Sequence, residues 1–125
     1  MRIRELLSES SLAGGQGDVI EYKGGEIDIH TAPSHAPRSQ SVINFNVPEE
    51  SRNLGIGDTL VKMALKKYHD LGAQVSSLSS LKVFYNNGFR NPDIPGASFE
   101  EHASVFQDQG GSLFMARNDA DGNPY

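Results

Sequence analysis

The segment from Gly55 to Leu71 sets the strongest limit on the fold of this 125-residue chain. Its apolar residues recur at helical spacing, with charged residues on the opposite side, which predicts one amphipathic helix. The residues of this apolar face are Ile56, Leu60, Met63, Ala64, Tyr68 and Leu71. The patterns QSVINFNV (40–47) before it and AQVSSL (73–78) after it predict two parallel strands. The order predicts a right-handed βαβ crossover, with Gly72 as the helix C-cap.

The flanking segments predict further strands and a second helix. Residues 18–30, DVIEYKGGEIDIH, are typical of a hairpin that turns at Gly24-Gly25. Residues 79–89, SSLKVFYNNGF, predict a shorter helix that ends at Gly88, and residues 112–117, SLFMAR, predict the last strand. Two sets of side chains are expected on the apolar side of their strands: Ile27 and Ile29 in the hairpin, and Ile43, Phe45 and Val47 in the strand before the long helix.

The remaining segments predict a single domain over 1–117, followed by a flexible tail over 118–125. A short helix is expected over 1–9, a flexible connection over 10–17 and a loop over 31–39, where two prolines interrupt any period. The turn-rich stretch after Phe89 contains the capping-box pattern of Ser98 and Glu101. Segment 91–111 either covers a substrate or only connects two elements, and the sequence leaves both alternatives open.

Composition excludes several classes of function. The 11 basic and 16 acidic residues give a net charge of −5 with no basic run, which argues against nucleic acids and anionic membranes as partners. The absence of cysteine excludes disulfides and thiolate metal sites, and the four histidines lack metal-ligand spacing, so we expect no metal. No long apolar stretch predicts a signal peptide or membrane span, so we expect a cytoplasmic protein or one in an intracellular assembly.

Gly55 and Gly57 stand where the strand gives way to the long helix. Glycine lowers helix propensity by about 1 kcal/mol relative to alanine, so the pair needs a geometric reason. Unpaired amides and the helix dipole favour an anion at such a start, although a tight turn without a ligand also explains the glycines. The chain has neither GxxxxGK[ST] nor GxGxxG with a suitably spaced acidic residue, so a P-loop and a dinucleotide fold are disfavoured.

Residues 47–73, VPEESRNLGIGDTLVKMALKKYHDLGA, resemble the acyl-CoA-binding segment of the GNAT superfamily of N-acyltransferases. The family pattern is Arg/Gln-x-x-Gly-x-Gly/Ala after a strand, and Arg52, Gly55 and Gly57 match it. Residues 75–90, VSSLSSLKVFYNNGFR, are similar to the fifth strand and fourth helix of the family. The resemblance implies an α/β (α+β) fold with a GNAT-like mixed central sheet, a β-α-β crossover and a short second helix.

The resemblance also implies a site for acetyl-CoA, which would act as co-substrate. Backbone amides from Leu54 to Asp58 would hold the pyrophosphate, and the strand edge at Asn46 and Val47 would pair with the pantetheine arm. A backbone amide near Val47 would hold the oxyanion. The cofactor-binding residues implied are Asn46, Val47, Arg52, Asn53, Leu54, Gly55, Ile56, Gly57, Asp58 and Phe84.

The family's proton donor is a tyrosine four residues before the glycine that ends the helix. Counting back from Gly88 reaches Phe84, so Tyr85 takes the catalytic role only if the helix end is one residue tighter. The general base is not assigned by any motif. Its nearest candidates are Asp28, His30, Glu49 and Glu50, each of which also fits a solvated surface residue.

These residues predict an acetyl-CoA-dependent N-acetyltransferase that acts on a primary amine of a small molecule or protein. The alternative is a catalytically degenerate GNAT-like binding or structural protein, for example a component of a phage particle. A third interpretation is a small α/β domain whose glycines serve only the turn. A homo-oligomer or an assembly partner is compatible with all three.

Overall fold

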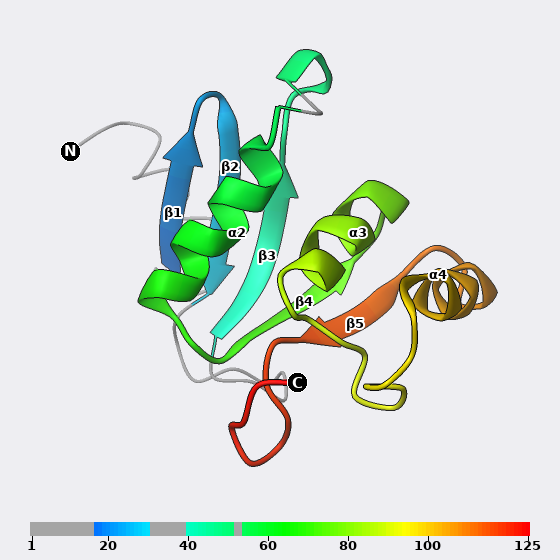
Figure 1. Ribbon diagram of the computed structural model, residues 1–125. Coiled ribbons are helices and arrows are strands. Elements are labelled where there is room, and N and C mark those ends of the chain that lie inside the picture. Colours follow the sequence, from blue (N-terminus) through cyan, green and yellow to red (C-terminus); the bar gives the residue numbers. More distant parts are fainter. Residues whose placement is uncertain (1–16, 31–39, 52–53) are drawn as a thin grey trace.

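The computed structural model describes residues 17–30, 40–51 and 54–125, which form one mixed five-stranded sheet and three helices (Figure 1). The strands are β1 (Gly17–Tyr22), β2 (Gly25–His30), β3 (Gln40–Asn46), β4 (Leu71–Val75) and β5 (Leu113–Ala116). The helices are α2 (Ile56–Lys67), α3 (Leu78–Asn86) and α4 (Phe99–Asp108), and the 3-10 turn η2 spans Glu49–Ser51. The predictions for 1–9, 10–16 and 31–39 lie outside the described residues.

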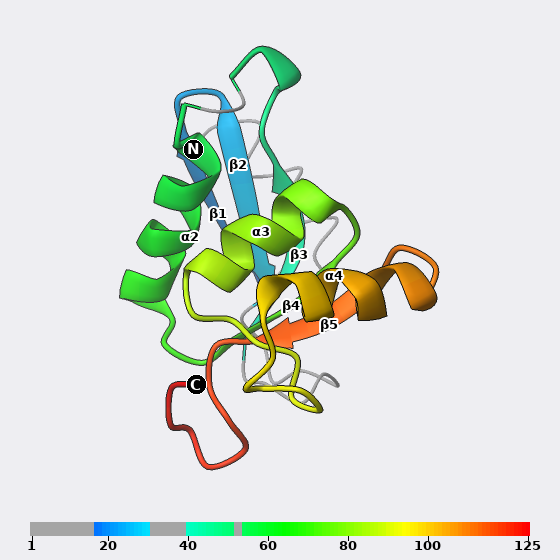
Figure 2. The same cartoon turned by 45° about the vertical axis from the view of Figure 1, so that its right-hand side comes forward.

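The strands follow one another in chain order across the sheet. Only β3 and β4 are parallel, and α2 connects them, which confirms the predicted mixed sheet with a β-α-β crossover. Helix α2 packs on β1 and β2, α3 lies beside α2, and α4 lies against α3 (Figures 1 and 2). No helix among the described residues is long and apolar enough to cross a membrane.

The β1–β2 hairpin confirms the sequence prediction, but its turn lies one residue earlier than expected. Tyr22 pairs with Gly25, so the turn residues are Lys23 and Gly24, with φ of 47° and 87°. Positive φ at both positions matches the twist of the strands that the turn joins. Ile27 and Ile29 are fully buried, as predicted.

Strand β3 contains a bulge that the alternation of its sequence did not predict. Asp28 of β2 pairs with Asn44, and Ile29 pairs with Val42, so Ile43 is passed over in the ladder. An extra residue reverses the alternation of faces in a strand. The prediction that Ile43 faces the core is therefore wrong: it is 49% exposed, whereas Val42 and Phe45 pack against the core.

Helix α2 ends at Lys67, four residues earlier than predicted, so Gly72 is not its cap. Tyr68 is extended, and its hydroxyl donates to Asp18 at 2.7 Å, while Lys67 pairs with the same carboxylate. Burial, together with this hydrogen bond and the Asp18 charge, raises the pKa of Tyr68 to about 12. These contacts fasten the end of α2 to β1, and the chain then enters β4 at Leu71.

Helix α3 and strand β5 confirm the predictions, whereas α4 was missed. The Ser98–Glu101 capping box is present and begins α4, so a helix occupies part of segment 91–111. His102 is fully buried in this helix. Its Nε2 accepts from the Asn91 amide at 3.0 Å, and its Nδ1 lies 2.9 Å from the Ser98 carbonyl oxygen.

Residues 118–125, predicted to be a flexible tail, form a turn in the structure. Asn118 pairs with Pro124, and the Asp119 carboxylate accepts from the amides of Asp121 and Asn123, both at 2.9 Å. The mobility of this segment stays a prediction.

Candidate functional site

The parallel strands β3 and β4 separate after a short pairing, and this separation creates the candidate site. Only Gln40–Val42 pairs with Leu71–Ala73, and the rest of β3 runs on without a partner in β4. We call the space of about 540 Å³ between the two strands the sheet cavity. It is lined by Ser41–Phe45 of β3, Gly72–Ser76 at β4, Ser80 and Phe84 of α3, His30 and Phe114.

A second space, which we call the helix-start cavity, lies where β3 ends and α2 and α3 begin. It measures about 460 Å³ and is lined by 45–47, 55–58, Ser77, Ser79, Ser80, Lys82, Val83 and Asn86. Phe45 and Ser80 line both cavities. The two cavities therefore adjoin at these two side chains.

The two glycines at the start of α2 have different structural reasons. Gly55 has a φ of 75°, in the left-handed region, and a Cβ built there meets no atom of the described residues within 4 Å. A Cβ on Gly57 would lie 3.1 Å from Phe45 Cζ and 3.5 Å from Val47 Cγ2. Gly57 thus allows α2 to pack closely on β3, while Gly55 turns the chain into the helix.

The structure brings most of the predicted cofactor-binding residues together. Asn46, Val47, Gly55, Ile56, Gly57 and Asp58 line the helix-start cavity, and Phe84 lines the sheet cavity. Leu54 is 71% exposed and does not belong to either lining. Arg52 and Asn53 lie outside the described residues.

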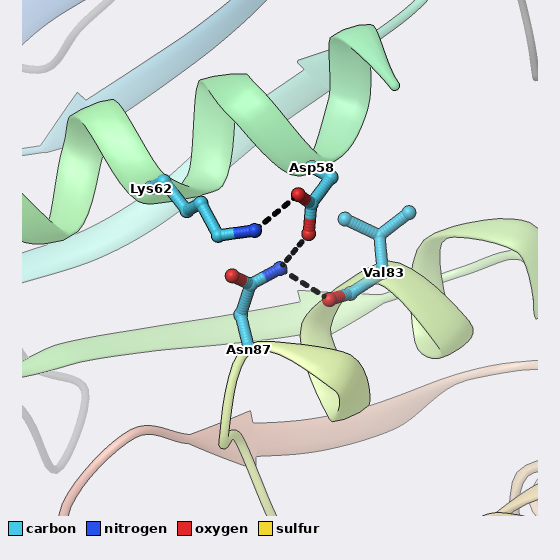
Figure 3. Close-up of polar contacts among 4 residues, drawn as sticks. All are labelled: Asp58, Lys62, Val83 and Asn87. Carbon is cyan, nitrogen blue, oxygen red and sulfur yellow. Dashed lines mark hydrogen bonds and ion pairs between the residues drawn. The ribbon is translucent and has the colours of Figure 1, made fainter. Parts of the chain in front are cut away.

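The Asp58 carboxylate is engaged in contacts between helices (Figure 3). It forms an ion pair with Lys62 and accepts a hydrogen bond from Asn87 Nδ2 at 2.8 Å, which also donates to the Val83 carbonyl at 2.8 Å. The hydrogen bond from Lys62 lowers the pKa of Asp58 most; Asn87 and the Lys62 charge lower it further, and partial burial opposes them. These contacts hold the start of α2 against the end of α3.

Replacement of Asp58 by asparagine is expected to lower the free energy of unfolding at pH 7 by about 0.5–1 kcal/mol, because the ion pair with Lys62 is lost. The effect is small because the Asp58 side chain is 40% exposed and its charge is screened by solvent. The folded-state pKa lies below the unfolded value, so the carboxylate stabilises the fold above the unfolded pKa. This contribution is lost as the pH falls through the folded pKa. Urea unfolding of both proteins at pH 7 and at about pH 3 measures it; an equal difference at both pH values would contradict the role of the charge.

Tyr85 is not brought to either cavity. Its hydroxyl donates to the Ala97 carbonyl at 2.9 Å, and its ring contacts Phe99 and His102 edge to face. The Arg90 guanidinium lies 3.6 Å from the ring centroid. Because α3 keeps helical phase up to Asn86, Phe84 faces the sheet and Tyr85 faces α4. The geometry does not support the predicted role of Tyr85 as proton donor in either cavity.

Among the four base candidates, His30 lines the sheet cavity, while Asp28, Glu49 and Glu50 line neither cavity. The Nδ1 atom of His30 is buried and has no hydrogen-bond partner in the described part of the chain. No group of three or more histidine, aspartate or glutamate residues suited to a metal ion occurs among the described residues.

Phe45, Ser80 and Lys82 are among the lining residues that sequence reasoning did not assign to the site. A signal for the serine was available, because residues 76–80 read SSLSS at the start of the second predicted helix. Serine is favoured at a helix N-cap, and Ser77 is the cap observed, with its Oγ accepting from the Ser80 amide at 3.1 Å. All four serines line one cavity or both, and the position of Ser80 at their boundary depends on α3 beginning at Leu78.

Comparison with known proteins found no match: no family model, no curated protein and no solved structure is significantly similar to this chain.

Proposed function

We propose that this chain binds an acyl-coenzyme A and transfers the acyl group to a primary amine, as an acetyl-CoA-dependent N-acetyltransferase with a GNAT-like fold. The observation that carries the proposal is the pair of cavities that meet at Phe45 and Ser80, where β3 leaves β4. A thioester entering through one cavity and an amine entering through the other would meet at this point. The motif of Gly55 and Gly57 also supports this proposal, because it resembles the acyl-CoA-binding pattern of the GNAT superfamily.

The open part of β3 suits the pantetheine arm of coenzyme A. Beyond Val42, β3 has no partner in β4, and Phe45 and Asn46 line the helix-start cavity. Pantetheine is an extended chain with two amide groups, and such a chain can add to a strand edge as another strand would. The ligand would therefore continue the sheet where β4 turns away.

The start of α2 suits the pyrophosphate. Gly55 makes no side-chain cap, so the first amides of the helix, those of Ile56, Gly57 and Asp58, are not satisfied by a capping side chain. Lys82 lines the same cavity and supplies a positive charge, while the Asp58 carboxylate is paired with Lys62 and Asn87. Amide donors, helix dipole and lysine together favour a bound anion.

One observation favours the second candidate, a GNAT-like protein that binds coenzyme A or a partner without catalysis. The hydroxyl of Tyr85, the only tyrosine of α3, is bonded to Ala97 away from both cavities. A protein that has lost this proton donor can keep the fold and the ligand site. Binding without transfer would be the result expected for it.

Titration calorimetry with acetyl-CoA and with CoA, followed by an assay of CoA thiol release with a panel of primary amines, tests both candidates. We expect dissociation constants in the micromolar range, which correspond to a binding free energy of about −8 kcal/mol. We also expect the release of the coenzyme A thiol to depend on the amine. Binding without release would favour the second candidate. The absence of binding by either ligand would contradict the acyl-CoA site.

A further inference from the structure

Ser80 is the polar side chain that the two cavities share. It is the third residue of α3, half-buried, and lies where the linings of the sheet cavity and the helix-start cavity meet. The other shared residue, Phe45, has no polar side-chain atom. A sulfur atom passing from one cavity to the other would therefore meet the Ser80 hydroxyl.

The hydrogen bonds around Ser80 leave its own proton available. Its Oγ accepts a hydrogen bond from the Ser77 hydroxyl at 2.9 Å, and the Ser77 oxygen in turn accepts from the Ser80 amide. These two bonds fix the position of the Ser80 oxygen. Among the described residues, the Ser80 hydroxyl proton has no acceptor, so Ser80 can donate into the cavities.

We propose that Ser80, and not Tyr85, is the catalytic residue that donates a hydrogen bond to the sulfur of coenzyme A. The inference rests on the proposed function. The amine nitrogen attacks the thioester carbonyl carbon, the C–N bond forms, and the C–S bond breaks with its electron pair passing to sulfur. Ser80 stabilises the thiolate through this hydrogen bond, and the proton lost by the amine passes to water. The products are the amide and coenzyme A.

A hydrogen bond to an ionised sulfur lowers the pKa of the thiol, because it stabilises only the charged form strongly. This effect can be measured with coenzyme A alone, by following thiolate ultraviolet absorbance of the bound ligand as the pH is raised. Replacement of Ser80 by alanine is expected to raise the pKa of the bound thiol by about one unit. The threonine variant keeps the hydroxyl and is expected to restore the lower pKa.

Two control variants separate this role from general effects on the site. Ser104 is exposed on α4 and lines neither cavity, so Ser104→Ala should leave the thiol pKa unchanged. Tyr85→Phe should also leave it unchanged. The inference is overturned if Ser80→Ala binds coenzyme A with an unaltered thiol pKa, or if Tyr85→Phe produces the shift. Failure of the wild-type protein to bind coenzyme A would instead refute the proposed function, and the inference with it.

Discussion

Replacement of Phe84 by alanine is expected to lower the free energy of unfolding by about 3–5 kcal/mol. Phe84 is 1% exposed and joins α3 to the sheet, with its ring centroid 5.2 Å from that of Phe45 and 4.9 Å from that of Phe89. Its removal leaves a cavity in the core and eliminates two edge-to-face aromatic contacts. The change is measured as a lower urea midpoint with an unchanged slope.

Leu78 provides the control for this prediction, since it lies on the same helix and is 44% exposed. Its replacement by alanine should cost no more than about 1 kcal/mol. A Phe84→Leu variant, which keeps most of the apolar volume, should lie between the two. A loss below about 1 kcal/mol for Phe84→Ala would show that α3 does not depend on this aromatic contact.

Replacement of Gly55 by aspartate is expected to weaken coenzyme A binding at least tenfold, or by about 1.4 kcal/mol, because it places a negative charge beside the proposed pyrophosphate position. Aspartate is among the few residues that tolerate the left-handed conformation, and the space for its Cβ is open. The left-handed conformation at position 55 should cost about 1 kcal/mol of stability, which the negative charge at the helix start partly offsets. Calorimetry gives the affinity, and urea unfolding gives the stability.

Asparagine at position 55 is the matched control, because it has nearly the same shape and the same tolerance of positive φ without the charge. It should bind coenzyme A within about threefold of the wild-type protein. Equal affinities of the aspartate and asparagine variants would contradict an anion site at the start of α2. A variant of Gly57 would be a poorer test, because its Cβ would press on Phe45 and disturb the packing.

The patterns that repeat over several residues predicted the fold well. The hairpin, β3, α2, α3 and β5 all follow from apolar periods and turn residues in their own segments. The early end of α2 does not follow from such a local pattern. It depends on contacts of Lys67 and Tyr68 with Asp18, about fifty positions away in the chain. Helix α4 carries a capping box, but its burial of His102 depends on the Asn91 amide outside the helix.

The sequence located the part of the candidate site that the backbone forms. It did not predict the part that depends on the direction in which side chains point. The glycine motif marked the start of α2, and Gly55, Ile56, Gly57 and Asp58 line the helix-start cavity. Phe84 and Tyr85 are neighbours in the sequence and lie about 100° apart around the helix, so only one can face the sheet. The count back from Gly88 reached Phe84, and packing against Phe45 and Phe89 places this ring on the side of the sheet.

The bulge at Ile43 makes the site depend on the number of residues in β3 as well as on their identity. Regular alternation from Val42 would place Asn44 on the core side and Phe45 on the other side. With the extra residue, Phe45 lies on the core side and lines both cavities. Asn44 then lies on the other side and donates to the carboxylates of Glu26 and Asp28. Loss of Ile43 would remove the bulge and keep Val42 and Phe45 on the core side, whereas loss of the bulge with all seven residues kept would place the Asn44 amide where the cavities meet.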